Sequence, residues 1–275
     1  MQYVHNHHKM LKAGLLIAIS AILYGFLGFL GTKVSKDNMS TSSMLFWRFL
    51  ISTMWTFIFV VRSGGTIQLI KADKMLLLFT LVIGSVGYAA SSQCYFIASE
   101  HVGTGLAMVI FFIYPIMITL FSWLTKKSAF NFKTLLILTS MMGGLFMLKE
   151  TSNHSPGFTG ILYGVSAAIF YAFYIIGSKK YSNTPIDSNV LTTLLSLGCT
   201  LLFLVLSLSE HSLSLPTSRN TWIYILILGT VATAIPIQLM LEGLKHISSV
   251  RASIISVLEP LVTVMVGVFL LGESI

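Results

Sequence analysis

The chain has 275 residues, of which 55% are hydrophobic and 9% are charged, and its mean hydropathy is +0.86. Because an ordinary soluble domain carries about 25% charged residues, this composition excludes a soluble globule and predicts a surface that mostly faces lipid. The formal net charge of +8 comes from 17 basic and 9 acidic residues. The basic residues lie between apolar runs, so they indicate membrane topology and not a nucleic-acid surface.

Apolar runs along the chain are long enough to cross a bilayer, which takes about 20 residues of helix. Continuous runs without strict alternation favour helices over a barrel. We therefore predict an all-α, polytopic membrane protein with nine spans. They lie at residues 13–34, 44–61, 75–97, 102–124, 133–148, 158–178, 190–209, 221–244 and 249–271. The first run has no convincing cleavage site, so it is expected to remain as a helix.

The distribution of Lys and Arg between the loops predicts the orientation. With the N-terminus inside, twelve basic residues fall on the cytoplasmic side and five on the outer side. The positive-inside rule therefore predicts a cytoplasmic N-terminus. The loops are short apart from those at 62–74 and 210–220, so no soluble catalytic domain is expected between the spans.

An internal repeat is the most informative feature of the sequence. Residues 84–128 align without gaps on residues 229–273, at an offset of 145. In this alignment Gly84, Gln93 and Pro115 meet Gly229, Gln238 and Pro260. The match predicts two halves, residues 1–152 and 153–275, each built on five helices. Because five is an odd number, the second half would cross the membrane in the opposite sense, as in the inverted repeats of transporters.

Several short motifs carry a resemblance to a known family. They are Tyr24-Gly25 followed by Lys33, Phe46-Trp47-Arg48-Phe49, Pro115, Glu259-Pro260 and Gly272-Glu273. In these motifs and their order, the chain resembles the EamA-type members of the drug/metabolite transporter superfamily. The resemblance implies a ten-helix inverted repeat in the bacterial inner membrane, which carries small metabolites or amino acids and is often an exporter. With nine spans found and ten implied, we expect the last helix of the second half to be missing.

Two charged residues inside spans are the main candidates for substrate binding or coupling. Glu259 lies near the middle of the ninth predicted span, where an ionisable group costs several kcal/mol unless it is paired, hydrated or protonated. It is expected to accept a proton or hold a substrate cation, and the alternative is a carboxyl that joins two helices. Arg48 is expected at the outer edge of the second span, where it meets an anionic substrate group or closes a gate. The alternatives for Arg48 are an extended side chain at the outer headgroups and a structural pair with another side chain.

Uncharged polar groups and prolines inside spans form a second set of candidates. Gln93 and Gln238 occupy equivalent repeat positions and either face a central cavity or hydrogen-bond between helices. Four tyrosines either line a cavity for amphipathic solutes or only pack: Tyr88, Tyr114, Tyr171 and Tyr174. Three prolines either break helices and expose carbonyls near a midplane site or make simple kinks: Pro115, Pro236 and Pro260.

Sequence patterns of enzymes and metal sites are missing. There is no Gly-Lys pair for a phosphate loop, no His-Glu-x-x-His pair for zinc, and no histidine in the middle of a span. The two cysteines, Cys94 and Cys199, lie in apolar runs, where they behave as small hydrophobes. We therefore expect no enzyme, no cofactor and no metal site.

Together these patterns predict a secondary transporter that works by alternating access and uses a proton or substrate gradient. Its expected partners are the lipid bilayer, a small-molecule substrate and protons, with no nucleic acid, and a homodimer remains open. The main alternative is a membrane protein that does not transport, either an inactive transporter or a regulatory subunit.

Overall fold

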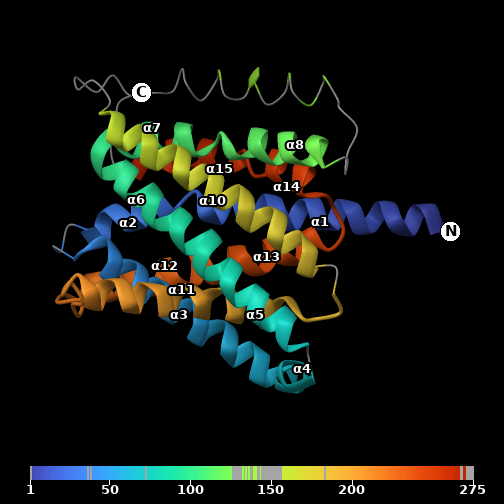
Figure 1. Ribbon diagram of the computed structural model, residues 1–275, viewed down its shortest axis with the longest axis horizontal. Coiled ribbons are helices and arrows are strands. Elements are labelled where there is room, and N and C mark those ends of the chain that lie inside the picture. The colour runs from blue at the N-terminus through green and yellow to red at the C-terminus, as the bar shows by residue number, and fades with distance from the viewer. Residues whose placement is uncertain are drawn as a thin grey trace.

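The computed structural model describes residues 2–35, 37, 39–71, 73–125, 157–182, 184–266 and 269–270, and single residues between 132 and 143. Every regular element in these residues is a helix (Figure 1). Eight spans in them are long and apolar enough to cross a membrane, which confirms the predicted all-α, polytopic fold. They are His8–Ser35, Thr41–Arg62, Lys74–Val102, Thr104–Leu124, Phe158–Tyr181, Ser188–Ser209, Arg219–Leu244 and Ser249–Val266.

These eight spans correspond to eight of the nine predicted from the sequence. The predicted span at 133–148 lies outside the described residues, apart from single positions, so the total of nine stays a prediction. Three spans are uninterrupted helices: α3 (Thr41–Arg62), α10 (Phe158–Ser182) and α11 (Ser188–Ser209). A short helix, α4 (Gly65–Lys71), follows α3.

The other five spans are built from consecutive helices. The first contains α1 (Gln2–Tyr24) and α2 (Leu27–Ser35), and the third contains α5 (Lys74–Val82), the π-helix η1 (Ile83–Ala89) and α6 (Ala90–Val102). The fourth contains α7 (Thr104–Phe111) and α8 (Tyr114–Leu124). Near the C-terminus lie α12 (Arg219–Gly229), the π-helix η2 (Thr230–Ala234) and α13 (Ile235–Leu244), followed by α14 (Ser249–Ile255) and α15 (Leu258–Val266).

Short polar side chains set the first residues of several spans. Ser40 precedes α3, and its hydroxyl accepts a hydrogen bond from the backbone N–H of Ser43 at 3.2 Å. Asp187 does the same for α11, with the N–H of Asn189 at 2.7 Å. These caps satisfy backbone donors that have no partner inside the helix. The starts of these two helices are thus encoded locally.

The interruptions in the spans recur at equivalent positions of the proposed repeat. The π-helices η1 and η2 cover residues 83–89 and 230–234, and the offset of 145 places the second on residues 85–89 of the first. Each of the three prolines lies in the first turn of a helix that follows an interruption: Pro115 in α8, Pro236 in α13 and Pro260 in α15. Proline is tolerated there because its missing N–H has no acceptor within the helix.

The interruption of the first span allows α15 to approach closely. A Cβ atom on Gly25 would lie 2.6 Å from the Cβ of Val262 and 3.1 Å from the carbonyl oxygen of Glu259. The carbonyl of Gly25 accepts a hydrogen bond from the hydroxyl of Thr263 at 3.2 Å. Only glycine fits this contact, which holds the start of α15 beside the gap between α1 and α2.

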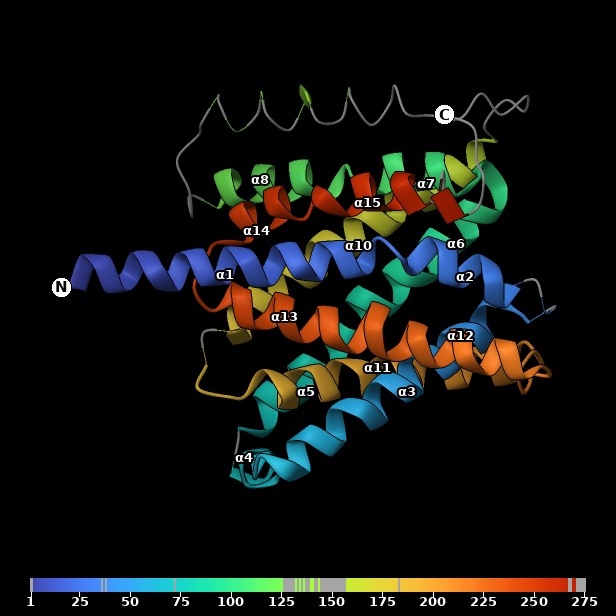
Figure 2. The same ribbon diagram turned by 180° about the vertical axis from the view of Figure 1, so that it is seen from behind.

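Helices α3 and α11 form an antiparallel pair (Figures 1 and 2). Their contact carries a series of hydroxyl pairs, with Thr193 donating to Thr56 at 2.9 Å and the hydroxyls of Thr53 and Thr200 3.2 Å apart. Hydrogen bonds between hydroxyls join helices in a bundle that lipid surrounds. Since α3 starts at residue 41 and α11 at residue 188, Thr53 and Thr200 occupy the same position in the two helices.

Two close crossings flank this pair. A Cβ atom on Gly84 of η1 would lie 2.4 Å from the carbonyl oxygen of Leu195 in α11. A Cβ atom on Gly229 of α12 would lie 2.8 Å from the carbonyl oxygen of Arg48 in α3. Gly84 and Gly229 are equivalent in the sequence repeat. At both crossings backbone atoms contact backbone atoms. These contacts fix the distance of span Lys74–Val102 from α11 and of span Arg219–Leu244 from α3.

Candidate functional site

A buried cavity with a volume of about 40 Å³ lies among the spans. This volume accommodates a few water molecules or one small polar group. Its lining comes from α1, α2, α3, η1, α6, α7, α10 and α15. The lining residues are Tyr24, Leu27, Arg48, Tyr88, Ser91, Ser92, Tyr95, Phe96, Met108, Phe111, Tyr171 and Glu259. The two charged candidates of the sequence, Arg48 and Glu259, therefore meet at one cavity.

Glu259 is the acidic group of this site. It is the second residue of α15, and its side chain is buried, with 7% of the residue exposed. In the described part of the chain its carboxylate makes no hydrogen bond and no ion pair. A carboxylate at this depth is strongly disfavoured unless a proton, water or a ligand cation compensates its charge. The geometry thus leaves Glu259 available to a ligand.

Arg48 is the basic group, and two other helices hold its guanidinium in place. Its Nε donates to the hydroxyl of Thr233 in η2 at 2.7 Å, and its Nη2 donates to the hydroxyl of Tyr88 in η1 at 3.3 Å. The guanidinium carbon also lies 4.8 Å from the centre of the Phe49 ring, within cation–π distance. Arg48 is only 1% exposed, so the alternative of an extended side chain at the outer headgroups does not fit this structure. The hydrogen bonds to Thr233 and Tyr88 fit the other alternative, a structural pair between helices, as well as a role in substrate binding.

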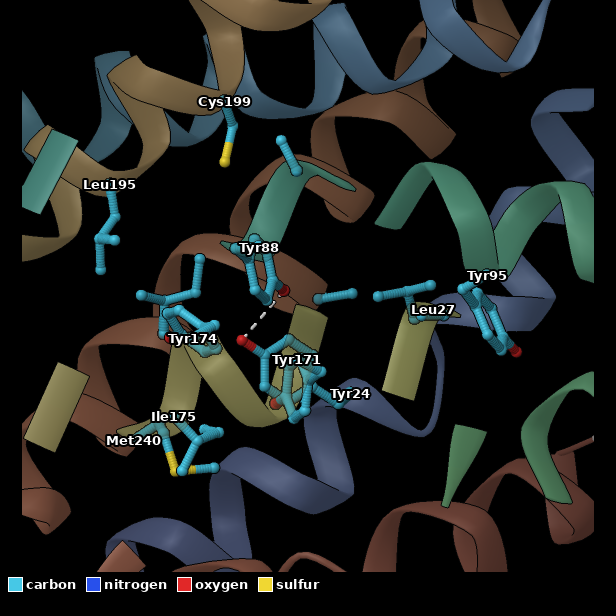
Figure 3. Packing of buried hydrophobic residues seen from close by; sticks show 14 of the residues in the cluster. Tyr24, Leu27, Tyr88, Tyr95, Tyr171, Tyr174, Ile175, Leu195, Cys199 and Met240 are labelled. Atoms are coloured by element: carbon cyan, nitrogen blue, oxygen red, sulfur yellow. Dashed lines mark hydrogen bonds between the residues drawn. The ribbon is translucent and has the colours of Figure 1, made fainter. Parts of the chain in front are cut away.

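Of the four tyrosines of the sequence prediction, two line the cavity, Tyr88 and Tyr171. Figure 3 shows these two close to Tyr174. Tyr88 donates a hydrogen bond to the hydroxyl of Tyr24 at 3.1 Å, and Tyr171 packs beside it. The ring of Tyr174 lies 4.8 Å from that of Tyr88, and the ring of Tyr114 lies 4.7 Å from that of Tyr171. Tyr114 and Tyr174 therefore pack against the two tyrosines that line the cavity.

The two glutamines lie away from the cavity and connect helices. Nε2 of Gln93 donates to the hydroxyl of Ser42 in α3 at 3.4 Å. Nε2 of Gln238 donates to Oδ1 of Asn189 in α11. These contacts fit the alternative of hydrogen bonding between helices. The prolines do not line the cavity either, and the carbonyl of Pro236 is occupied by the hydroxyl of Ser20 at 2.8 Å.

Sequence reasoning did not select eight of the lining residues as candidates: Tyr24, Leu27, Ser91, Ser92, Tyr95, Phe96, Met108 and Phe111. Two of them carried a usable signal. Tyr24 precedes Gly25, at which the first span is interrupted, and the Ser91-Ser92 pair is a polar step inside an apolar run. Within the described residues, no group of three or more His, Cys, Asp or Glu side chains is placed to hold a metal ion.

An apolar bundle of spans around a charged cavity fits a polytopic membrane transporter. The EamA-like transporter family matches residues 11–149 and 158–275, and the chain belongs to this family. An uncharacterized transporter of Archaeoglobus fulgidus is 25% identical over 259 residues, covering 94% of this chain and 87% of that protein. The uncharacterized transporter YxxF of Bacillus subtilis is 24% identical over 263 residues, covering 93% and 81%.

A solved structure shares the fold. The chain described as "Crystal structure of protein" superposes with a TM-score of 0.79 at 15% sequence identity, and the match covers 96% of this chain and 89% of that one. At this identity the likeness establishes the fold alone. The family match and the transporter relatives establish that the protein is a membrane transporter.

Proposed function

We propose that the protein carries small zwitterionic solutes of the amino-acid type, in exchange for protons, by alternating access. The observation that supports this proposal is the presence of Arg48 and Glu259 at one buried aromatic cavity. A guanidinium binds a solute carboxylate through charge-assisted hydrogen bonds, and a carboxylate binds an ammonium group. The aromatic wall of Tyr88 and Tyr171 suits an apolar side chain or the face of a cation. Both charges of the solute are thus matched.

Proton coupling would follow from competition at Glu259. One carboxylate cannot hold a proton and pair with an ammonium group at the same time. Release of the proton would therefore accompany solute binding, which makes the carrier an antiporter. In the bacterial inner membrane, with the N-terminus cytoplasmic, an inward proton gradient would drive the solute outward. This reasoning favours export, and Glu259 is the coupling group.

Two polar contacts at opposite ends of the α3–α11 pair support alternating access. The outer clamp joins the first residues of α3 to α6, with Thr41 donating to Oε1 of Glu100 at 2.6 Å and Gln93 donating to Ser42. With the N-terminus inside, this end faces outward.

The inner clamp repeats the outer one at the start of α11. Ser188 donates to Oε2 of Glu242 at 2.6 Å, and Gln238 donates to Asn189. Ser188 and Asn189 are the first two residues of α11, as Thr41 and Ser42 are of α3. The repetition supports the proposed inverted repeat of residues 1–152 and 153–275, in which each half contributes one gate.

The two clamps differ in strength. Lys245 adds an ion pair to Glu242 at 2.7 Å in the inner clamp. In the outer clamp the Oε1 atom of Gln93 is buried without a hydrogen-bond partner among the described residues. An unpaired buried acceptor is costly, so the outer clamp holds its helices less firmly. We therefore expect the outer end to open more readily than the inner end.

Counterflow in proteoliposomes tests the proposal. Vesicles are loaded with a pooled panel of amino acids, of the amines that lack their carboxylate and of the acids that lack their amino group. Exchange of the zwitterions, with much slower exchange of both analogue sets, is the expected result. Glu259→Gln should remove the dependence on a pH gradient, while Glu210→Gln, which alters an exposed carboxyl at the end of α11, should not. If no compound exchanges, the non-transporting alternative is favoured.

A further inference from the structure

A second, larger pocket lies next to the cavity. This pocket, called the vestibule below, has a volume of about 340 Å³ and shares the side chains of Tyr95 and Phe96 with the cavity. Its lining includes Ser35 at the end of α2 and the exposed Glu100 in the last turn of α6. The vestibule therefore extends from the outer ends of these helices to Tyr95 and Phe96. These two side chains, called the partition below, lie between the vestibule and the cavity.

Two aromatic rings form this partition. The rings of Tyr95 and Phe96 meet edge to face, with centroids 5.5 Å apart. The hydroxyl of Tyr95 is buried and has no hydrogen-bond partner among the described residues. Phe96 packs directly on the backbone of α2, since a Cβ atom on Gly31 would lie 2.7 Å from its ring. Both spaces are lined by these two side chains, so we expect rotation about their χ angles to open a path between the spaces.

The two volumes suit different parts of a solute. The cavity, at about 40 Å³, takes a small polar group, whereas pockets that hold small organic ligands measure about 300–1,000 Å³. The vestibule, at about 340 Å³, falls in this range. In this conformation only the vestibule accommodates an entire solute the size of an amino acid, so binding of a whole solute at Glu259 requires the cavity to widen.

Four polar side chains of the vestibule present hydrogen-bond acceptors: Thr32, Ser35, Ser99 and Glu100. Three lining hydroxyls donate their own protons to backbone carbonyls one turn earlier: Thr32 to Phe29, Ser35 to Gly31 and Ser99 to Tyr95. Their oxygens keep free lone pairs. Glu100 accepts from Thr41 through Oε1, and Oε2 has no partner in the described part of the chain. A carboxylate, acceptor oxygens and an aromatic face together fit an ammonium group.

We infer that the vestibule is a second binding site, which holds the ammonium end of the solute at Glu100 before it passes Tyr95 and Phe96. The identity of the solute as an amine-bearing molecule rests on the proposed function. The site itself rests on the vestibule's volume and acceptors.

Calorimetric titration of the purified full chain with phenethylammonium tests this site, with 2-phenylethanol as the uncharged control. Two bound ammonium molecules per chain are expected, and one in Glu100→Gln, whose amide oxygen still accepts from Thr41. Thr41→Val, which removes that hydrogen bond and keeps the charge, should retain both. Two molecules bound to Glu100→Gln would overturn the inference. If Glu259→Gln still binds two ammonium molecules and Glu100→Gln binds one, the inference of a vestibule site is supported and the proposed binding site at Glu259 is contradicted.

Cysteine labelling gives an independent measurement. Ser99→Cys places a thiol in the vestibule, and the parent chain with Cys94 and Cys199 is the background control. A cationic methanethiosulfonate reagent should label this thiol about tenfold faster than its neutral analogue, and phenethylammonium should protect it. Glu100→Gln should abolish both effects, as expected for the loss of one charge-assisted contact. Equal labelling and protection with and without the Glu100 charge would contradict an ammonium site.

Discussion

Substitution of Gly84 by alanine tests the closest crossing of the bundle. The added Cβ would lie 2.4 Å from the carbonyl oxygen and 2.7 Å from the Cα of Leu195. An ordinary contact begins at 3.4 Å, so the helices must separate by about 3.4 − 2.4 = 1.0 Å at this point. Because the contacted atoms belong to the backbone, no side chain can rotate away.

Overpacking of this kind costs about 1–3 kcal/mol, and the gain of alanine over glycine in a helix returns about 0.5–1 kcal/mol. We expect Gly84→Ala to lower the unfolding free energy by about 1–2 kcal/mol. It should also weaken solute binding, because Tyr88 of the cavity lies one turn further along the chain.

Denaturant unfolding in detergent micelles, followed by circular dichroism, measures the effect. Gly105→Ala is the matched control, since Gly105 lies in α7 with no atom within 4 Å of its added Cβ, and this change should stabilise by about 0.5–1 kcal/mol. Equal or greater stability of Gly84→Ala relative to Gly105→Ala would refute the described crossing.

Three further outcomes follow from other contacts in the structure. Arg48→Met removes the group proposed to bind the solute carboxylate. In calorimetry it should weaken the binding of zwitterions at least about tenfold and the binding of amines much less. Equal losses of affinity for zwitterions and amines would contradict this role of Arg48. Ser188→Ala should loosen the inner clamp and speed the labelling of cysteines introduced near the cytoplasmic end. Thr41→Val should loosen the outer clamp and speed the labelling of cysteines introduced near the outer end. If both variants change labelling equally at the two ends, the account of two gates is contradicted. Hydrogen bonds from Thr221 and Thr217 lower the pKa of Asp37 below its ordinary value of 3.8. The stability from this contact is therefore complete above that value and is lost as the pH falls through the lower folded-state pKa, so Asp37→Asn should reduce the acid dependence of unfolding below pH 3.8. An unchanged acid profile would contradict the contact.

The membrane fold was accessible from the sequence because lipid imposes a simple rule. A span needs a long apolar run, and the eight described spans agree with the predicted ranges to within a few residues at most ends. Glu259 and Arg48 were identifiable for the same reason, since charge inside an apolar run is costly and rare. That the two meet at one cavity depends on how α3 and α15 pack, which composition does not encode.

The uncharged part of the site was harder to predict. Tyr95 and Phe96 look like ordinary apolar lining of a span, and their role at the partition depends on the rotation of α6. That rotation is altered by the π-helix η1, which inserts an extra residue into a turn and shifts the faces of all later residues. The same uncertainty affected Gln93 and Gln238, whose side chains face α3 and α11 and not the cavity.

Proton release on solute binding tests the central claim most directly, namely that solute and proton compete for Glu259. The purified protein is mixed, in weakly buffered detergent solution near neutral pH, with a solute that counterflow has identified, and a pH-indicator dye reports the protons released. The account predicts release that rises with occupancy towards one proton per bound solute and that disappears in Glu259→Gln. Saturable binding without proton release, or release that persists in Glu259→Gln, would contradict it.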